Sequence, residues 1–222
     1  ITSVTKTDPT QCGGSNGTIT LSGLVPNTKY QLNFTGTSAA TSIPKSGDTV
    51  TTSATGTILI SLVAAGNYSL SVASLILGPG QLDSCTSNVV PITVLDPPKP
   101  SAVVANPVSP VCQGTNIVVS LTSTLGANER YMWYTDMGAT TPANPAFSLS
   151  NTYSPATPPA TTGVLYVRKR NTVTLCDGPL LAVTYTVNLS PQITHSKVEP
   201  TTASSTDGSI TIGLSNNPGS AP

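Results

Sequence analysis

The sequence predicts an all-β chain made of tandem antiparallel β-sandwich domains. Short runs in which apolar and polar residues alternate recur along the chain, as expected of strands with one buried face. The 20 prolines and 18 glycines stand mostly between these runs, where they set turns and do not interrupt a ladder. Nowhere do apolar residues recur at helical spacing over several turns. These observations are typical of sandwiches with several short strands per domain.

The expected strands follow from the alternating runs in order. In the first half of the chain they are 17–21, 30–34, 57–62, 68–72 and 89–95. In the second half they are 117–121, 131–134, 164–167 and 182–189. Each run would place one face on a core and the other toward solvent.

A proline-rich segment marks the main domain boundary. Pro97, Pro98 and Pro100 stiffen the backbone toward polyproline II, which cannot lie within a central strand. We therefore expect a first sandwich over 1–96, a linker over 97–101 and a second sandwich over 102–190. The remaining residues, 191–222, are expected to be the partial start of a further repeat.

This last segment repeats the beginning of the chain. The runs ITS at 1–3 and NGTITL at 16–21 correspond to ITH at 193–195 and DGSITI at 207–212, about 191 residues later for the second run. The later copy lacks the cysteine that lies between the two runs in the first copy. Because two strands alone are marginal in water, we expect this segment to lean on the second domain or on another chain.

The composition limits the kinds of partner and the cellular compartment that we expect for this chain. Nine basic and nine acidic residues cancel, and only 8% of the chain is charged. Nucleic-acid binding depends on clustered Lys and Arg, so nucleic acid is not an expected partner. Hydroxyl side chains take the place of charges, which is typical of secreted β-proteins, and no run is apolar enough to span a membrane. We expect an extracellular or cell-surface location, and a chain that begins at Ile1 as a processed product or a piece of a longer protein.

Four cysteines divide into two per expected domain. Cys12 and Cys85 lie in the first domain, and Cys112 and Cys176 lie in the second. Pairing within each domain would close loops of about 65 to 75 residues and stabilise each domain by about 4 kcal/mol. Such disulfides require an oxidising compartment. The alternative is that the four are buried free thiols. A zinc site is not expected, because no Cys-x-x-Cys pair exists and the chain has one histidine.

The motifs of both domains resemble modules of large surface adhesins. They are CGGSNGTITL at 12–21, GNYSLSV at 66–72 and the later Cys85 in the first domain, then VCQG at 111–114, YMWY at 131–134, LYV at 165–167 and Cys176 in the second. The first set resembles the repeats of SprB-type adhesins of gliding Bacteroidetes, and the second is similar to the Ig-like modules that accompany them. The resemblance implies tandem Ig-like sandwiches, adhesion at the cell surface and export by the type IX route. The first domain departs from the repeat by a Ser/Thr/Gly insertion at 35–56, which leaves its strand count open.

No catalytic or metal-binding constellation is expected. His195 is the single histidine and has no nucleophile motif nearby. The acidic residues are scattered, mostly at turns, and no Asp-x-Asp run of a calcium loop occurs. The sequence therefore predicts a protein that is not an enzyme and that holds no cofactor.

Four residues are candidates for glycan contact or modification. Trp133 on the third strand of an Ig-like domain is typical of a core plug, and the alternative is a sugar-binding platform. Arg168 and Arg170 would share one face of a strand, either guarding a solvated sheet edge or contacting an anionic glycan. Thr49 lies in the run DTV, which resembles the O-glycosylation acceptor of the same bacterial group.

The predicted function is that of a structural or adhesive repeat segment of a large extracellular surface protein or filament. The expected partners are neighbouring repeats or identical subunits, joined head to tail through 192–222, and a surface polysaccharide. The alternative is an accessory, carbohydrate-binding region of a secreted polysaccharide-degrading enzyme.

Overall fold

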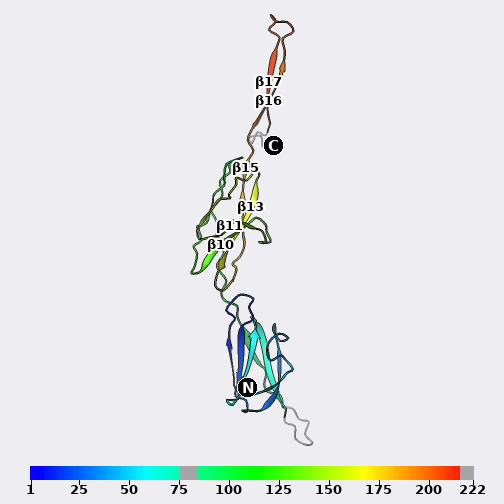
Figure 1. Ribbon diagram of the computed structural model, residues 1–222, viewed down its shortest axis with the longest axis vertical. Coiled ribbons are helices and arrows are strands. Elements are labelled where there is room, and N and C mark those ends of the chain that lie inside the picture. Colours follow the sequence, from blue (N-terminus) through cyan, green and yellow to red (C-terminus); the bar gives the residue numbers. More distant parts are fainter. Residues whose placement is uncertain (76–84, 216–222) are drawn as a thin grey trace. The chain divides into compact units, whose positions relative to one another are not determined.

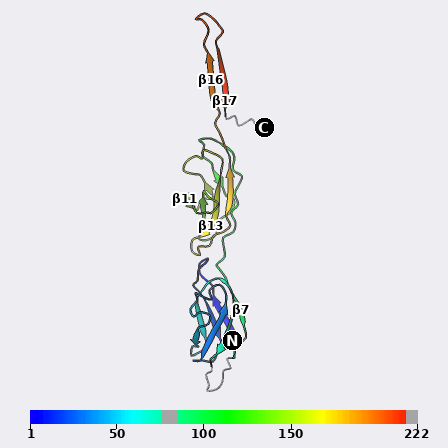
Figure 2. The ribbon, with the colours of Figure 1, turned by 90° about the vertical axis from the view of Figure 1, so that its right-hand side faces the viewer.

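The computed structural model describes residues 1–75 and 85–215, and in these ranges every regular element is a β-strand (Figures 1 and 2). Contacts divide the chain into two compact units. Unit 1 comprises Ile1–Lys99 and Asn171–Cys176, and unit 2 comprises Pro100–Arg170 and Asp177–Pro222. The all-β fold class predicted from the alternating runs is confirmed. The described part of the chain contains no helix with the length and hydropathy of a membrane span.

Unit 1 is an antiparallel sandwich of two sheets. The 3-stranded sheet has the order β1-β2-β5, with bounds Ser3–Thr7, Gly17–Ser22 and Ile58–Val63. The 4-stranded sheet has the order β4-β3-β6-β7, with bounds Thr49–Thr51, Lys29–Thr35, Gly66–Ser74 and Val90–Val94. Since the chain crosses between the sheets after β2, β4 and β5, the connections are those of an Ig-like sandwich.

The core of unit 1 lies between these two sheets. Alternate residues of β2 and β3 are buried, among them Ile19 and Leu21 on β2 and Leu32 and Phe34 on β3. Side chains from both sheets form one buried cluster. The period of two in the sequence therefore sets which face of each strand meets the core.

The Ser/Thr/Gly insertion of unit 1 is ordered. It contributes the edge strand β4 and a bridge between Ile43 and Ser61. Its Ser38 is buried, and its hydroxyl lies 3.0 Å from the hydroxyl of Tyr68, which also donates to the carbonyl of Ala64 at 2.8 Å. The insertion thus satisfies the polar end of a core tyrosine, as buried hydroxyls require.

Unit 2 is built around a 4-stranded sheet of order β11-β10-β13-β14, with bounds Pro142–Ser148, Glu129–Tyr134, Gly163–Asn171 and Leu181–Tyr185. Two shorter pairs accompany this sheet. Strand β12, Thr152–Tyr153, pairs with β9, Val119–Ser120, and β15, Val187–Asn188, is parallel to β8, Val111–Cys112. The strand that carries Arg168 and Arg170 is β13. It lies inside the sheet, so the interpretation of these residues as guards of a sheet edge is wrong.

A carboxylate closes the turn between β10 and β11. Asp136 accepts hydrogen bonds from the backbone N–H of Thr140 at 3.1 Å and from the hydroxyl of Thr140 at 2.9 Å. The backbone N–H of Thr141 donates to the same carboxylate. The backbone hydrogen bonds from Thr140 and Thr141 lower the pKa of Asp136 from 3.8 to about 2.

We expect the Asp136 turn to keep its hydrogen bonds far into acid. A pKa that is lowered in the folded state stabilises the fold above the unfolded pKa of about 4, and this contribution is lost as the pH falls toward about 2. Following the side-chain carbonyl carbon by NMR should give a midpoint near 2 in the folded chain and near 4 in urea. A folded-state midpoint near 4 would contradict the turn geometry.

Strands β16 and β17, Gln192–Val198 and Ser209–Ser215, form a 2-stranded sheet with each other. All residues of β16 are exposed. Their register runs from Gln192 opposite Ser215 to Val198 opposite Ser209 without a shift. We call this element the C-terminal hairpin.

Candidate functional site

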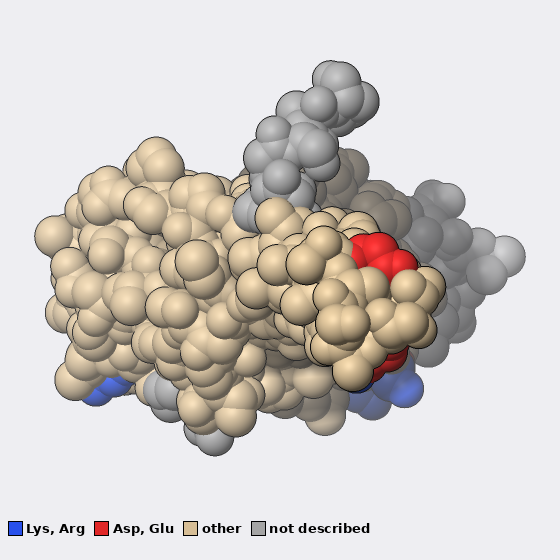
Figure 3. Space-filling view, turned by 90° about the horizontal axis from the view of Figure 1, so that it is seen from above, with Lys and Arg blue, Asp and Glu red and all other residues tan. Residues whose placement is uncertain are grey.

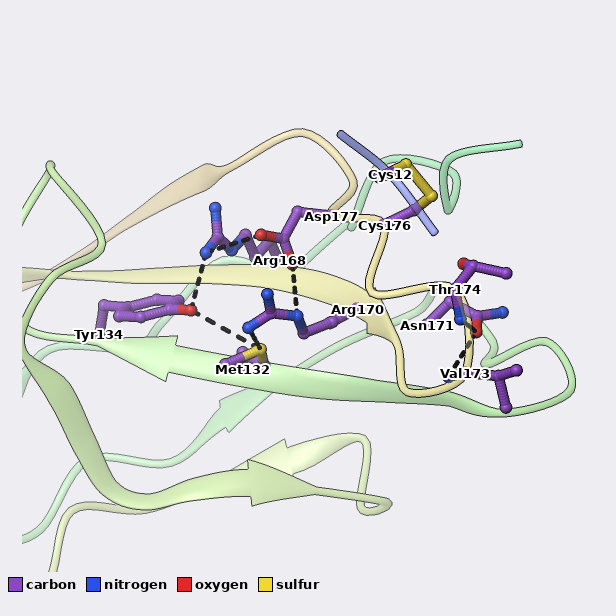
Figure 4. A network of polar contacts seen from close by, with 10 residues as sticks. All are labelled: Cys12, Met132, Tyr134, Arg168, Arg170, Asn171, Val173, Thr174, Cys176 and Asp177. Carbon is purple, nitrogen blue, oxygen red and sulfur yellow. Dashed lines mark hydrogen bonds and ion pairs between the residues drawn. A yellow bond between two sulfur atoms is a disulfide. The ribbon is translucent and has the colours of Figure 1, made fainter. Parts of the chain in front are cut away.

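A disulfide joins Cys12 to a turn that is distant in sequence. Cys12 and Cys176 are bonded, with a sequence separation of 164 and a Cα–Cα distance of 5.0 Å (Figure 4). The backbone N–H of Cys12 donates to the carbonyl of Thr174 at 2.9 Å. The side chain of Asn171 shapes this turn, because its Oδ1 accepts from the N–H groups of Val173 and Thr174 at 2.9 and 3.0 Å.

The expected pairing of the cysteines within each domain is therefore wrong. Cys12 is not bonded to Cys85, and Cys176 is not bonded to Cys112; Cys85 and Cys112 are exposed and free. The expectation assigned cysteines to domains by sequence. The turn 171–176 follows a strand of unit 2 along the chain, yet its contacts place it in unit 1. The asparagine of the run NTVTLC signals a turn, but not the partner of that turn.

Two arginines share one carboxylate on unit 2 (Figure 4). Asp177 lies 2.9 Å from Nη2 of Arg168 and 3.3 Å from Nε of Arg170. Arg168 also donates to the hydroxyl of Tyr134 at 3.0 Å, and its guanidinium carbon lies 5.1 Å from the centre of that ring. Nη1 of Arg170 lies 3.9 Å from the sulfur of Met132. We call these five residues the arginine cluster.

The arginine cluster carries one more positive charge than negative charge. The side chains of Arg168, Arg170 and Asp177 are 21%, 31% and 26% exposed, so an anion could reach them. Lys169 points to the opposite face, where it is buried with its Nζ 3.1 Å from Oγ of Ser101. The alternation of the three basic residues thus separates a buried lysine from a partly exposed pair of arginines.

The other sequence candidates are not members of the arginine cluster. Trp133 is fully buried and stacks on Tyr153 with ring centroids 4.5 Å apart, so its ring offers no exposed platform to a sugar. Thr49 is exposed on the edge strand β4, and its glycosylation stays a prediction. His195 is exposed on the C-terminal hairpin. Within residues 1–75 and 85–215, no group of three or more His, Cys, Asp or Glu is placed to hold a metal ion.

One face of the C-terminal hairpin, which we call the apolar face, carries four large apolar side chains beside His195 and Lys197. Opposed residues of antiparallel strands share a face, and the register pairs Ile193 with Leu214, and Ile212 and Ile210 with His195 and Lys197. The large apolar side chains on this face are mostly exposed: Ile193 70%, Ile210 73%, Ile212 68% and Leu214 65%. Exposed apolar side chains that lie together in this way are typical of interaction surfaces.

The same hairpin geometry occurs at the start of unit 1. Lys6 lies opposite Ile19 in the pairing of β1 with β2, and Lys197 lies opposite Ile210 in the C-terminal hairpin. The lysines occupy corresponding positions of the sequence repeat, and so do the isoleucines. The remaining pairs follow in the same order, so the two hairpins have one register.

The connections of the two hairpins match as well. The N–H of Thr10 donates to Oδ1 of Asn16 at 3.0 Å, and the N–H of Thr201 donates to Oδ1 of Asp207 at 3.0 Å. The hydroxyl of Thr10 accepts from the side-chain amide of Asn16 at 2.8 Å, whereas the hydroxyl of Thr201 donates to the carboxylate of Asp207 at 2.6 Å. Hydrogen bonds from Ser205 and Thr201 also lower the pKa of Asp207. The two hairpins therefore share the hydrogen bond from a threonine N–H to a side-chain oxygen in the turn, as well as the register of their strands.

No family model matches this sequence, and no curated protein sequence matches it. Among solved structures, the chain is similar to the D0-D1 domain of intimin, with 12% identity and a TM-score of 0.25 over 82% of this chain and 97% of that chain. It is similar to the BSP domain of a biofilm associated protein, with 16% identity and a TM-score of 0.27 over 83% of this chain and 29% of that chain. The adhesin domain of Epf from Streptococcus pyogenes has 11% identity and a TM-score of 0.26 over 78% of this chain and 73% of that chain.

Proposed function

We propose that this chain is a structural and adhesive repeat segment of a large extracellular surface protein and that it performs no catalysis. The observation that carries the proposal is the repetition of the first hairpin, with the same register and the same turn hydrogen bonds, after an intervening sandwich. A protein that repeats such units presents the same surfaces many times. Repetition raises avidity without demanding a strong single site.

Two further features support a location outside the cell. The chain contains the Cys12–Cys176 disulfide, and disulfides persist in oxidising compartments but are rare in the cytosol. Most of the surface visible in Figure 3 is uncharged, in keeping with a composition of 8% charged residues. The motif resemblance adds the finer proposal of an SprB-type adhesin of gliding Bacteroidetes that is exported by the type IX route.

Intact cells of the source organism offer the direct test. A Fab raised against unit 1 should label cells that have not been permeabilised, and deletion of the gene should lower attachment to surfaces. The same Fab on permeabilised cells controls for access. Labelling that requires permeabilisation would contradict the proposed location, and unchanged attachment would contradict the adhesive role.

The arginine cluster favours a second candidate function, that of an accessory region that binds anionic polysaccharide. Its two guanidinium groups match carboxylate or sulfate groups, and the hydroxyl of Tyr134 beneath them accepts a hydrogen bond from Arg168 that holds its guanidinium in place. We expect binding on an array of sulfated and carboxylated glycans to fall about tenfold in Arg168→Gln/Arg170→Gln. Arg130→Gln is the control for loss of a positive charge from β10 outside the cluster, and it is compared charge for charge with the single variant Arg168→Gln. Equal binding by both variants would exclude the cluster as the glycan site.

A further inference from the structure

The apolar face of the C-terminal hairpin has a buried counterpart in unit 1. Ile19 and Leu21 of β2 are 1% and 0% exposed, whereas the corresponding Ile210 and Ile212 of β17 are 73% and 68% exposed. The two hairpins have the same register and turn, so the difference lies in what covers them. In unit 1 the cover is the body of the sandwich, formed by β3 to β7.

We propose that this apolar face is the docking surface for a sandwich body of the unit-1 kind, that is, a body with the strands β3 to β7 and an unoccupied place for β1 and β2. The role of the hairpin would then be that of the first two strands of another sandwich. The occupant is specified by what β2 contacts in unit 1. This assignment does not require the adhesive role, because it is argued from the comparison of the C-terminal hairpin with β1 and β2 of unit 1.

The pairing of β2 with β5 defines the edge that β17 would meet. Ile19 lies opposite Ile60 and Leu21 opposite Ile58 in an antiparallel ladder, and both isoleucines of β5 are buried. In the described structure β17 pairs on one side with β16, and its other side is the edge that corresponds to the β5 side of β2. An incoming strand with alternating apolar residues would continue the sheet and cover the apolar face.

A glycine of the repeat keeps this edge accessible. A Cβ on Gly17 would meet the carbonyl oxygen of Val63 on β5 at 2.7 Å, so a side chain there would push β5 away. Gly208 holds the corresponding place in the C-terminal hairpin, and the atoms nearest to its Cβ position belong to Pro200 and Val198 of the same hairpin. The position opposite β17 therefore has room for a strand that approaches as closely as β5 does.

The first experiment offers the hairpin a body whose own first strands are missing. The variant lacks residues 1–22, carries Cys85→Ser and Cys112→Ser, and carries Ala203→Cys, since Ala203 corresponds to Cys12. If the hairpin of one molecule fills the open place in the next, the thiol at position 203 should bond to Cys176 of that neighbour when oxidised glutathione is added as the oxidant. We expect a ladder of head-to-tail oligomers in non-reducing electrophoresis, with the 203–176 link identified by mass spectrometry.

The controls of this experiment test the register and the apolar face. The full chain with the same cysteine substitutions should give no 203–176 link, because β1 and β2 occupy the place and Cys12 holds Cys176. Adding Ile210→Ser and Ile212→Ser to the deletion variant should abolish the ladder. Links only between two 203 positions, or pairing of hairpins face to face in the full chain, would overturn the assignment of the occupant.

A second experiment covers the case in which the deletion variant does not fold. Residues 23–99, with Cys85→Ser, are joined after Gly213 of the otherwise intact chain, at the position that corresponds to Ser22. We expect amide hydrogen exchange of β17 to slow by about 100-fold or more relative to the parent chain. The matched control again carries Ile210→Ser and Ile212→Ser. Exchange of β17 at the parent rate, while unit 1 stays protected, would overturn the proposal.

Discussion

Replacing Cys12 and Cys176 together by serine should lower the free energy of unfolding of unit 1 by about 4 to 5 kcal/mol. The bond spans a sequence separation of 164, and the chain between its ends includes nearly all of Ile1–Lys99. When unit 1 unfolds while unit 2 stays folded, the closed loop still contains about 90 flexible residues, and loop closure of this size accounts for the estimate. Urea unfolding, followed by hydrogen exchange in peptides of unit 1, measures the change.

The free cysteines supply the matched control for this prediction. Cys85→Ser with Cys112→Ser also removes two thiols, but both are exposed and unbonded, so the free energy of unfolding should change by less than about 0.5 kcal/mol. A large loss in this second variant would indicate that Cys85 is the partner of Cys12. Comparing the two double variants therefore separates the observed connectivity from the pairing that the sequence suggests.

The alternating runs predicted most of the strands that form the two cores. The runs around Ile19 and Leu32 alternate because each strand has one face on the core, and this signal needs no knowledge of the partner strands. The short strand β4 was not predicted, since Thr49–Thr51 lies in a hydroxyl-rich insertion without apolar alternation. Its position depends on pairing with β3, which is a tertiary contact.

Long-range contacts account for what the sequence did not reveal about the candidate sites. Arg168 and Arg170 were predicted to share a face, but their carboxylate partner follows a turn whose conformation the local pattern does not specify. Met132 and Tyr134 on the same sheet are buried beneath these side chains, so β10 is covered on both faces. A strand buried on both faces has no polar face to reveal its period.

The C-terminal hairpin also shows the difference between what the sequence reveals and what depends on strand pairing. The sequence indicates that 192–222 resembles the start of the chain, because NGTITL and DGSITI are similar runs. It does not show that Lys197 meets Ile210 as Lys6 meets Ile19. Nor does it show that the apolar face lies exposed. Register and exposure are properties of paired strands, and they are what makes the docking surface specific.

Trp133→Ala should cost unit 2 about 3 to 5 kcal/mol of its free energy of unfolding. The indole ring is fully buried in the core and stacks on Tyr153 with an angle of 20° between the rings. Alanine would leave a cavity and remove the stacking partner. Because a domain of this size is stable by only about 5 to 15 kcal/mol, a large share of the stability of unit 2 would be lost. Urea unfolding followed by hydrogen exchange in peptides of β10 and β13 measures the change.

Trp133→Phe and the peptides of unit 1 make this prediction specific. Phenylalanine retains a ring against Tyr153, so its cost should be smaller than that of alanine. Exchange in unit 1 should be unchanged in both variants, since its core cluster contains no residue of unit 2. A Trp133→Ala chain that keeps the stability of unit 2 but loses glycan binding would show instead that the ring contacts sugar. The burial of the ring favours the loss of stability, because a side chain without exposed surface acts through packing.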